Sequence, residues 1–142
     1  MRLVRSNTPY SNGQKLGPSF SIEYLGGHPQ YMKRERGTLK VLTDKIIFLS
    51  GHFGKKEKFS IPLKDIKRVE LQLEHKVTLG RMLLLGIFAF GAKKEKKYVV
   101  IDFNVAGMEA KAVFDFPGDI GDRKKQKLVQ TILEAKKLLV TK

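Results

Sequence analysis

The chain has 142 residues, of which 28 are Lys or Arg and 14 are Asp or Glu, so its formal net charge is +14. Its composition, 42% hydrophobic and 30% charged, is typical of a globular protein and suits one domain with a sizeable core. Cysteine is absent, which excludes disulfides, thiolate metal sites and cysteine nucleophiles and fits a reducing compartment.

Residues 1–18 are rich in Ser, Asn, Gly and Pro and show no periodicity, so we expect a flexible N-terminal arm. They lack the apolar run of a secretory signal, and no window reaches the roughly 18 apolar residues that span a bilayer. We therefore expect a cytoplasmic protein, peripheral at a membrane at most, with one domain over residues 19–142.

Alternation of apolar and polar side chains predicts a series of short strands. The predicted strands cover residues 20–25, 37–42, 45–50, 57–63, 67–74, 97–103 and 109–116. The strand over 45–50 is apolar on both faces, which predicts a central position in the sheet. Pro62 cannot donate a ladder hydrogen bond, so it predicts a strand end or edge.

The end of the chain is the one segment with a clear helical pattern. Leu128, Ile132, Ala135 and Leu139 follow one another at spacings of four, three and four and form one apolar stripe. Asp122 is the expected N-cap. Four cations crowd the first turns, where the helix dipole disfavours positive charge: Arg123, Lys124, Lys125 and Lys127. Because this arrangement is unfavourable for the helix itself, it is consistent with a helix surface that is basic for a reason other than helix stability.

These elements predict a mainly β fold with one C-terminal α-helix. We expect about seven antiparallel strands in a two-sheet sandwich or partly open barrel, capped by the helix.

Two motifs carry a resemblance to a known family. Residues 43–48 read Thr-Asp-Lys-Ile-Ile-Phe, and residues 59–66 read Phe-Ser-Ile-Pro-Leu-Lys-Asp-Ile. Over residues 19–140 the chain resembles GRAM and bacterial PH-like domains of the pleckstrin-homology superfold. The resemblance implies a non-catalytic binding or scaffold module, in which an exposed sheet edge or the groove beside the helix takes a protein partner.

The same resemblance draws attention to basic residues near the first hairpins, because pleckstrin-homology relatives often bind phosphoinositides there. The candidate anion or lipid ligands are Lys33, Arg34, Arg36, Lys40, Lys55, Lys56 and Lys58. Ile22, Glu23 and Tyr24 stand on the first strand, where the family pattern has a lysine. A protein partner is the favoured expectation, an acidic phospholipid surface is the alternative, and nucleic acid is a weaker one.

Nothing in the sequence predicts catalysis, a cofactor or a metal site. His28, His52 and His75 are scattered and lack the spacing of metal ligands. No phosphate-binding glycine loop and no nucleophile elbow is present. We therefore expect a protein that is not an enzyme.

The segment 81–99 reads RMLLLGIFAFGAKKEKKYV, an apolar run that ends in lysines. It is too short to span a bilayer, and its two glycines disfavour a helix. Three interpretations stay open: an extra or extended strand, the interface of a homo-oligomer, or shallow membrane insertion. Its candidate interaction residues are Leu84, Ile87 and Phe90.

Overall fold

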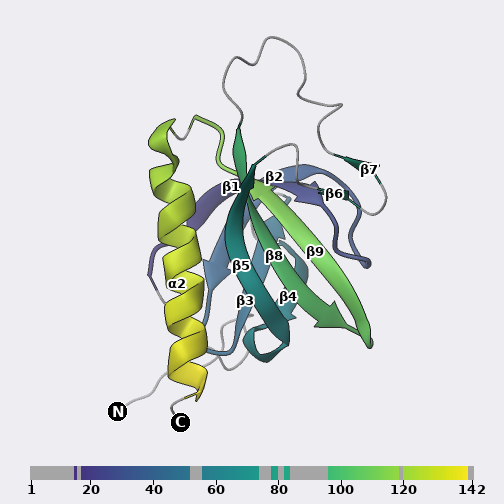
Figure 1. Cartoon of the computed structure of the whole chain (residues 1–142), viewed down its shortest axis with the longest axis vertical. Helices are drawn as coiled ribbons and strands as arrows, with labels where there is room; N and C mark the ends of the chain where they lie inside the picture. Colours follow the sequence, from purple (N-terminus) through teal and green to yellow (C-terminus); the bar gives the residue numbers. More distant parts are fainter. Residues whose placement is uncertain are drawn as a thin grey trace.

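The computed structural model describes residues 15, 17–51, 56–73, 78–79, 82–83, 96–118 and 120–140. Seven antiparallel strands form one open sheet, in the order β4-β3-β2-β1-β9-β8-β5. Their bounds are β1 (Phe20–Gly26), β2 (Glu35–Val41), β3 (Lys45–Ser50), β4 (Lys56–Pro62), β5 (Ile66–Leu73), β8 (Lys97–Val105) and β9 (Met108–Asp115). This arrangement confirms the predicted mainly β fold with a C-terminal helix (Figure 1).

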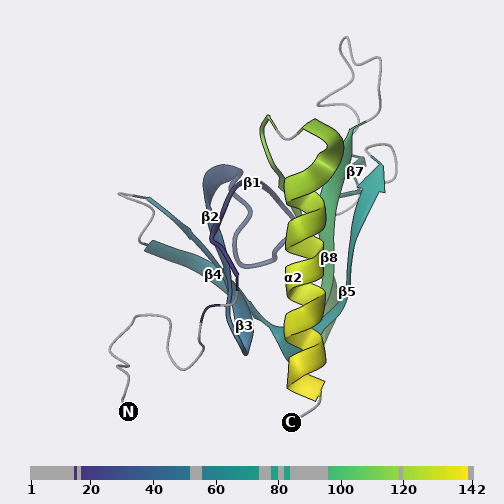
Figure 2. The same ribbon diagram turned by 90° about the vertical axis from the view of Figure 1, so that its left-hand side faces the viewer.

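The sheet has two halves, one from the first part of the chain and one from the later part. Strands β1 to β4 form one half and β5, β8 and β9 form the other. They are joined where β1 pairs with β9, with Tyr24 opposite Phe114. The two layers that the sequence predicts are therefore two halves of one continuous sheet. Figure 2 shows the halves diverging on either side of the helix.

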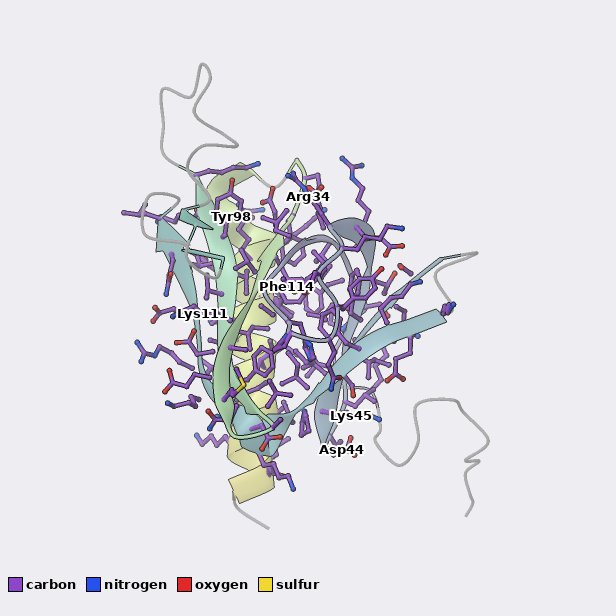
Figure 3. All side chains as sticks on the ribbon, turned by 90° about the vertical axis from the view of Figure 1, so that its right-hand side faces the viewer. Arg34, Asp44, Lys45, Tyr98, Lys111 and Phe114 are labelled. Carbon is purple, nitrogen blue, oxygen red and sulfur yellow. The ribbon has the colours of Figure 1, made fainter. Side chains whose placement is uncertain are left out.

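The main core lies between the halves, and the predicted alternation supplies it. Phe20, Ile22 and Tyr24 of β1 are buried in it, together with Phe114 of β9, which Figure 3 places in the interior. Each of these aromatic side chains buries a large apolar area.

Strand β3 is apolar on both faces because it contributes to two clusters. Its residues Ile46 and Phe48 enter the main core, whereas Ile47 and Leu49 pack with Leu42 on the opposite face of the sheet. β3 lies between β2 and β4, as expected for a doubly apolar strand. β4 is at the edge of the sheet and ends at Pro62, which confirms the prediction for this proline.

A second apolar cluster on the opposite face of the sheet was not predicted. It consists of Leu25, Tyr98, Val100 and Val113, all buried. Val99 and Ile101, their neighbours along β8, enter the main core instead. β8 is therefore apolar on both faces, like β3.

A 3₁₀ turn, η2 (Leu63–Asp65), connects β4 to β5, and another, η4 (Ile120–Asp122), precedes the helix α2 (Arg123–Val140). Three residues of the predicted stripe, Leu128, Ile132 and Ala135, are fully buried against the core, and Leu139 packs beside them. The Lys136 ammonium donates to the carbonyl of Ile66, which ties the last turns of α2 to the start of β5. The helix closes the open side of the sheet (Figure 2).

Several predictions fall partly or wholly outside the described residues. The residues outside the described part include four of the candidate site residues, Lys55, Leu84, Ile87 and Phe90, and most of the predicted arm over 1–18. Within this arm, Lys15 forms a β-bridge with Leu42. The extra strand in the segment 81–99 is confirmed for β7 (Met82–Leu83), which pairs with β6 (Thr78–Leu79). None of the helices in the described part of the chain is long and apolar enough to cross a membrane.

Candidate binding groove

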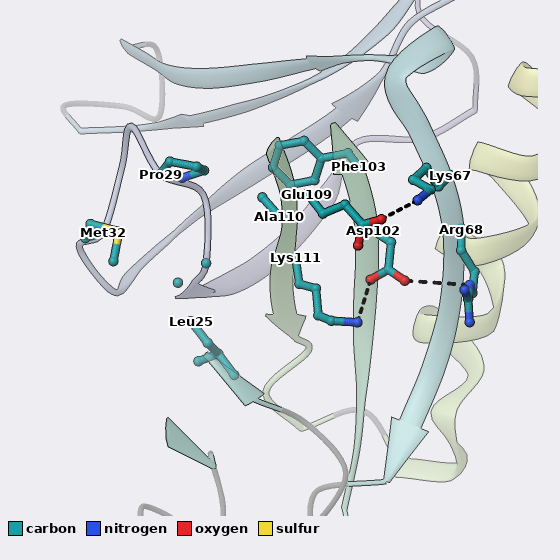
Figure 4. A pocket seen from close by; sticks show the side chains of 12 residues that line it. Leu25, Pro29, Met32, Lys67, Arg68, Asp102, Phe103, Glu109, Ala110 and Lys111 are labelled. Atoms are coloured by element: carbon teal, nitrogen blue, oxygen red, sulfur yellow. Dashed lines mark hydrogen bonds and ion pairs between the residues drawn. The ribbon is translucent and has the colours of Figure 1, made fainter. Parts of the chain in front are cut away.

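A groove of about 550 Å³ lies between the loop that follows β1 and the strands β5, β8 and β9 (Figure 4). The end of β1 and this loop supply an apolar side, made by Leu25 of β1 and by Pro29 and Met32 of the loop. Met32 is 72% exposed, the largest value among the exposed large hydrophobic residues in the described part of the chain. Phe103 and Ala110 line the groove between this side and the far one. An exposed methionine beside a hollow is an adaptable contact surface for a partner.

The opposite side of the groove is charged. Arg68, Asp102 and Lys111 lie directly across from one another on three neighbouring strands. One oxygen of the Asp102 carboxylate lies 3.1 Å from the Lys111 ammonium, and the other lies 3.6 Å from Nε of Arg68. Cross-strand pairs of opposite charge of this kind stabilise a sheet modestly.

A third ion pair completes this side. The Lys67 ammonium lies 2.6 Å from the Glu109 carboxylate, and its hydrogen bond holds the pKa of Glu109 below the usual value. The described lining of the groove thus has three cations and two carboxylates.

The loop is brought against β9 by a close approach of two backbones. The pairing of β1 with β9 shifts register between Tyr24 and Gly26. At the next residue, Gly27, φ is +109°, and a Cβ atom there would lie 1.7 Å from the carbonyl oxygen of Lys111. Only glycine fits this position. The apolar side of the groove therefore depends on Gly27.

His28 anchors the same loop in the core. Its side chain packs against Phe59 of β4 and Phe103 of β8, with ring centroids 4.7 and 5.2 Å away. The residue is 2% exposed, and its Nδ1 accepts a hydrogen bond from the backbone N–H of Gln30 at 3.0 Å. Burial lowers the pKa of His28 below 6.5, while a hydrogen bond with the backbone of Ser60 acts in the opposite direction. The loop is thus pinned by a neutral imidazole.

Two tyrosines hold the rest of the loop. The buried Tyr24 hydroxyl accepts from the backbone N–H of His28 at 2.9 Å and donates to the carbonyl of Tyr31. Burial raises the pKa of Tyr24 to about 12. The Tyr31 hydroxyl donates to the Glu35 carboxylate, which also accepts from the Ser50 hydroxyl at 2.6 Å. These hydrogen bonds fix the conformation of the loop, which forms one wall of the groove.

The buried imidazole leads to a prediction for the pH dependence of stability. Because the folded-state pKa of His28 lies below 6.5, its contribution is complete above pH 6.5 and is lost as the pH falls toward the folded pKa. The free energy of unfolding should fall by up to about 1.4 kcal/mol per pH unit in this window. Urea unfolding of the protein and of His28→Gln, which keeps an acceptor for Gln30, measures the difference. Parallel pH profiles would contradict the assignment.

Among the candidate anion ligands that the structure describes, Arg34 is paired with a carboxylate. Arg34 Nε lies 3.1 Å from the Glu23 carboxylate. Glu35 accepts hydrogen bonds from Ser50 and Tyr31, which lower its pKa, and the charges of Lys58 and Lys33 lower it further. Two carboxylates, those of Glu23 and Glu35, thus lie among these basic residues.

The other candidates are distributed along two strands. Arg36 precedes the strand predicted over 37–42 but lies in β2, because this strand starts at Glu35, which pairs with Tyr24 of β1. Arg36 lines a polar hollow of about 430 Å³ together with Lys124 of α2, and no acidic residue is among its described lining. Lys40 lies further along β2, opposite Ile47, and Lys56 starts β4. Lipid binding stays a prediction.

Two aromatic residues near lysines in the described part of the chain, Tyr31 and Tyr98, do not present open ring faces for stacking. Tyr98 is fully buried, and Tyr31 is partly buried and bonded to Glu35. Nucleic-acid binding by stacking requires exposed ring faces, so neither ring supports it. In the described residues, no group of three or more His, Asp or Glu side chains is placed to hold a metal ion.

Sequence reasoning did not single out the residues of the groove. Its charged side depends on the pairing of β5, β8 and β9, which brings Arg68, Asp102 and Lys111 into one row. The available signal was the Gly26-Gly27 pair followed by Pro29 and Met32, which marks a constrained loop with an apolar residue in a basic stretch. No protein-family model matches the chain, and the search of curated proteins gave no match either.

Proposed function

We propose that the chain is a non-catalytic binding module of the pleckstrin-homology type and that its groove holds a segment of a protein partner. The strand order supports this assignment: a four-strand meander and a three-strand meander joined through β1 and β9, followed by a C-terminal helix. The first sequence motif covers the turn before β3 and most of β3, and the second covers the end of β4, η2 and the first residue of β5.

The observation that carries the proposal is the groove itself. One side presents an exposed apolar side chain, Met32, and the other presents charged side chains held in place by ion pairs. A hollow with apolar contacts and a few fixed polar groups is the usual form of a specific binding site. The wall that carries Met32 is fixed by His28 and Tyr24, so a partner would meet a preorganised surface.

A photo-crosslinking amino acid at Met32 tests the proposal. We expect it to capture a protein partner in cells, whereas the same amino acid at Gln126, an exposed position on α2, captures none. Ala110→Arg, which places a long side chain in the groove, should abolish the capture at Met32. Gln126→Arg is the matched control and should leave it unchanged.

Two results would contradict the proposal. One is equal cross-linking from Met32 and Gln126, which indicates non-specific contact. The other is cross-linking from Met32 that persists in Ala110→Arg, provided that this variant unfolds at the temperature of the parent protein.

A further inference from the structure

We infer that the groove selects an acidic, extended segment, in which apolar side chains alternate with Asp or Glu. This inference rests on the proposed function, because it names the chemistry of the segment that the groove would hold. It is carried by the two unlike sides of the groove and by the excess of positive charge on one of them.

The charged side has more donors than its own carboxylates use. Arg68 is a guanidinium with five N–H donors, and its side chain is 62% exposed although it lies 3.6 Å from Asp102. The side chains of Lys67 and Lys111 are 47% and 45% exposed. A carboxylate of a partner can therefore reach these cations without displacing Asp102, which orients two of them.

The two carboxylates of the groove differ in how firmly they are held. The side chain of Asp102 is 16% exposed and lies between two cations, so its position on the charged side of the groove is fixed. Glu109 is 77% exposed on its side chain and meets Lys67 alone. Exposed pairs of this kind contribute little to stability, so an incoming carboxylate can replace Glu109 at low cost.

The geometry of the two sides fits an extended chain. Leu25, Pro29 and Met32 lie on one side of the groove, and Lys67, Arg68 and Lys111 lie on the other (Figure 4). Successive side chains of an extended segment point in opposite directions. A segment that lies along the groove thus turns every second residue toward the apolar side and the residues between them toward the cations.

The charge of the whole chain acts in the same direction. A net charge of +14 attracts an acidic partner before contact and raises the association rate, most strongly at low ionic strength. The long-range field favours any polyanion, however, so a test of the groove has to separate local contacts from this general attraction.

The test uses a fluorescent peptide of about ten residues in which Leu and Glu alternate, long enough to span the groove in extended form. Its controls are a Leu-Lys peptide and a block isomer with all Leu residues before all Glu residues. Fluorescence anisotropy at about 0.15 M salt, where the Debye length is about 8 Å, measures binding. We expect the alternating Leu-Glu peptide to bind, the block isomer to bind about tenfold more weakly and the Leu-Lys peptide not to bind.

Variants of the protein locate the site. Arg68→Glu should weaken binding of the Leu-Glu peptide about tenfold, while Lys127→Glu, the same charge change at an exposed position on α2, should change it less than about twofold. Lys111→Gln, compared with Lys127→Gln, gives a second pair in case Arg68→Glu fails to fold. Met32→Asp should also abolish binding.

Equal binding of the alternating and block peptides, equal losses in Arg68→Glu and Lys127→Glu, or no binding of the Leu-Glu peptide would overturn the inference. The cross-linking experiment at Met32 tests the proposed function, and its result does not depend on the peptide assay. Capture from Met32 without a preference for acidic peptides would leave the proposed function standing and refute the acidic specificity alone.

Discussion

Replacement of Lys125 by Met should lower the free energy of unfolding by about 3 kcal/mol, because it leaves a buried carboxylate without its buried partner. Lys125 is 2% exposed, and its ammonium lies 3.6 Å from Asp115 and 3.1 Å from Asp122. Asp115 is 3% exposed at the end of β9. The ion pair thus joins the last strand to the first turn of α2.

Chemical denaturation measures this effect, and Lys127→Met is the control, since it removes a lysine that is exposed on the same helix. Asp115 also accepts from the backbone N–H of Phe116 at 2.8 Å and from Lys96 at 2.9 Å, so part of its compensation remains. The double variant with Asp115→Asn should lose less than the sum of the two single losses. Additive losses would show that the pair does not couple.

Gly27→Ala should destabilise the protein by about 3 kcal/mol and should also displace the apolar side of the groove. The added Cβ would lie 1.7 Å from the Lys111 carbonyl oxygen, and φ is +109°, which L side chains rarely adopt. Backbone strain and overpacking each contribute on the order of 1–3 kcal/mol. The atoms nearest to the added Cβ belong to the backbone of Lys111 and Ala112 and not to a flexible side chain, so the loop itself has to move.

Gly107→Ala is the matched control for this substitution. Gly107 also has a positive φ, +78°, but nothing lies within 4 Å of an added Cβ. It should therefore cost only the local strain, about 1 kcal/mol. Thermal unfolding of the two variants measures the stability difference, and cross-linking from Met32 measures the displacement. Equal melting temperatures for the two variants would contradict the role given to Gly27.

Elements whose pattern is local in the chain could be predicted from the sequence. The alternation of Phe20, Ile22 and Tyr24 and the helical stripe around Leu128 and Ile132 reappear as buried faces. Such patterns depend only on the period of a strand or helix, and in this protein the tertiary packing buries the same faces that the patterns mark as apolar.

Features that depend on contacts between residues distant in the sequence could not be predicted from it. His28 was one of three scattered histidines, and its burial follows from Phe59 and Phe103, which lie on distant strands. Lys125 was read with its neighbours as part of a basic helix surface, but Asp115 and Asp122 hold it inside. In both cases a polar side chain can be buried because residues that are distant in the sequence, or on the other side of a turn, contact its polar atoms or pack around it.

The pairing of β1 with β9 also has a consequence for the order in which the chain can fold. Strands β1 to β4 are connected through neighbouring hairpins, so these contacts can form while the chain is still being synthesised. The second edge of β1 has no partner in the main sheet until β9, the last strand, has left the ribosome. A nascent first half therefore carries an open, apolar edge for most of translation, and it is during synthesis that this protein is most exposed to strand-to-strand aggregation.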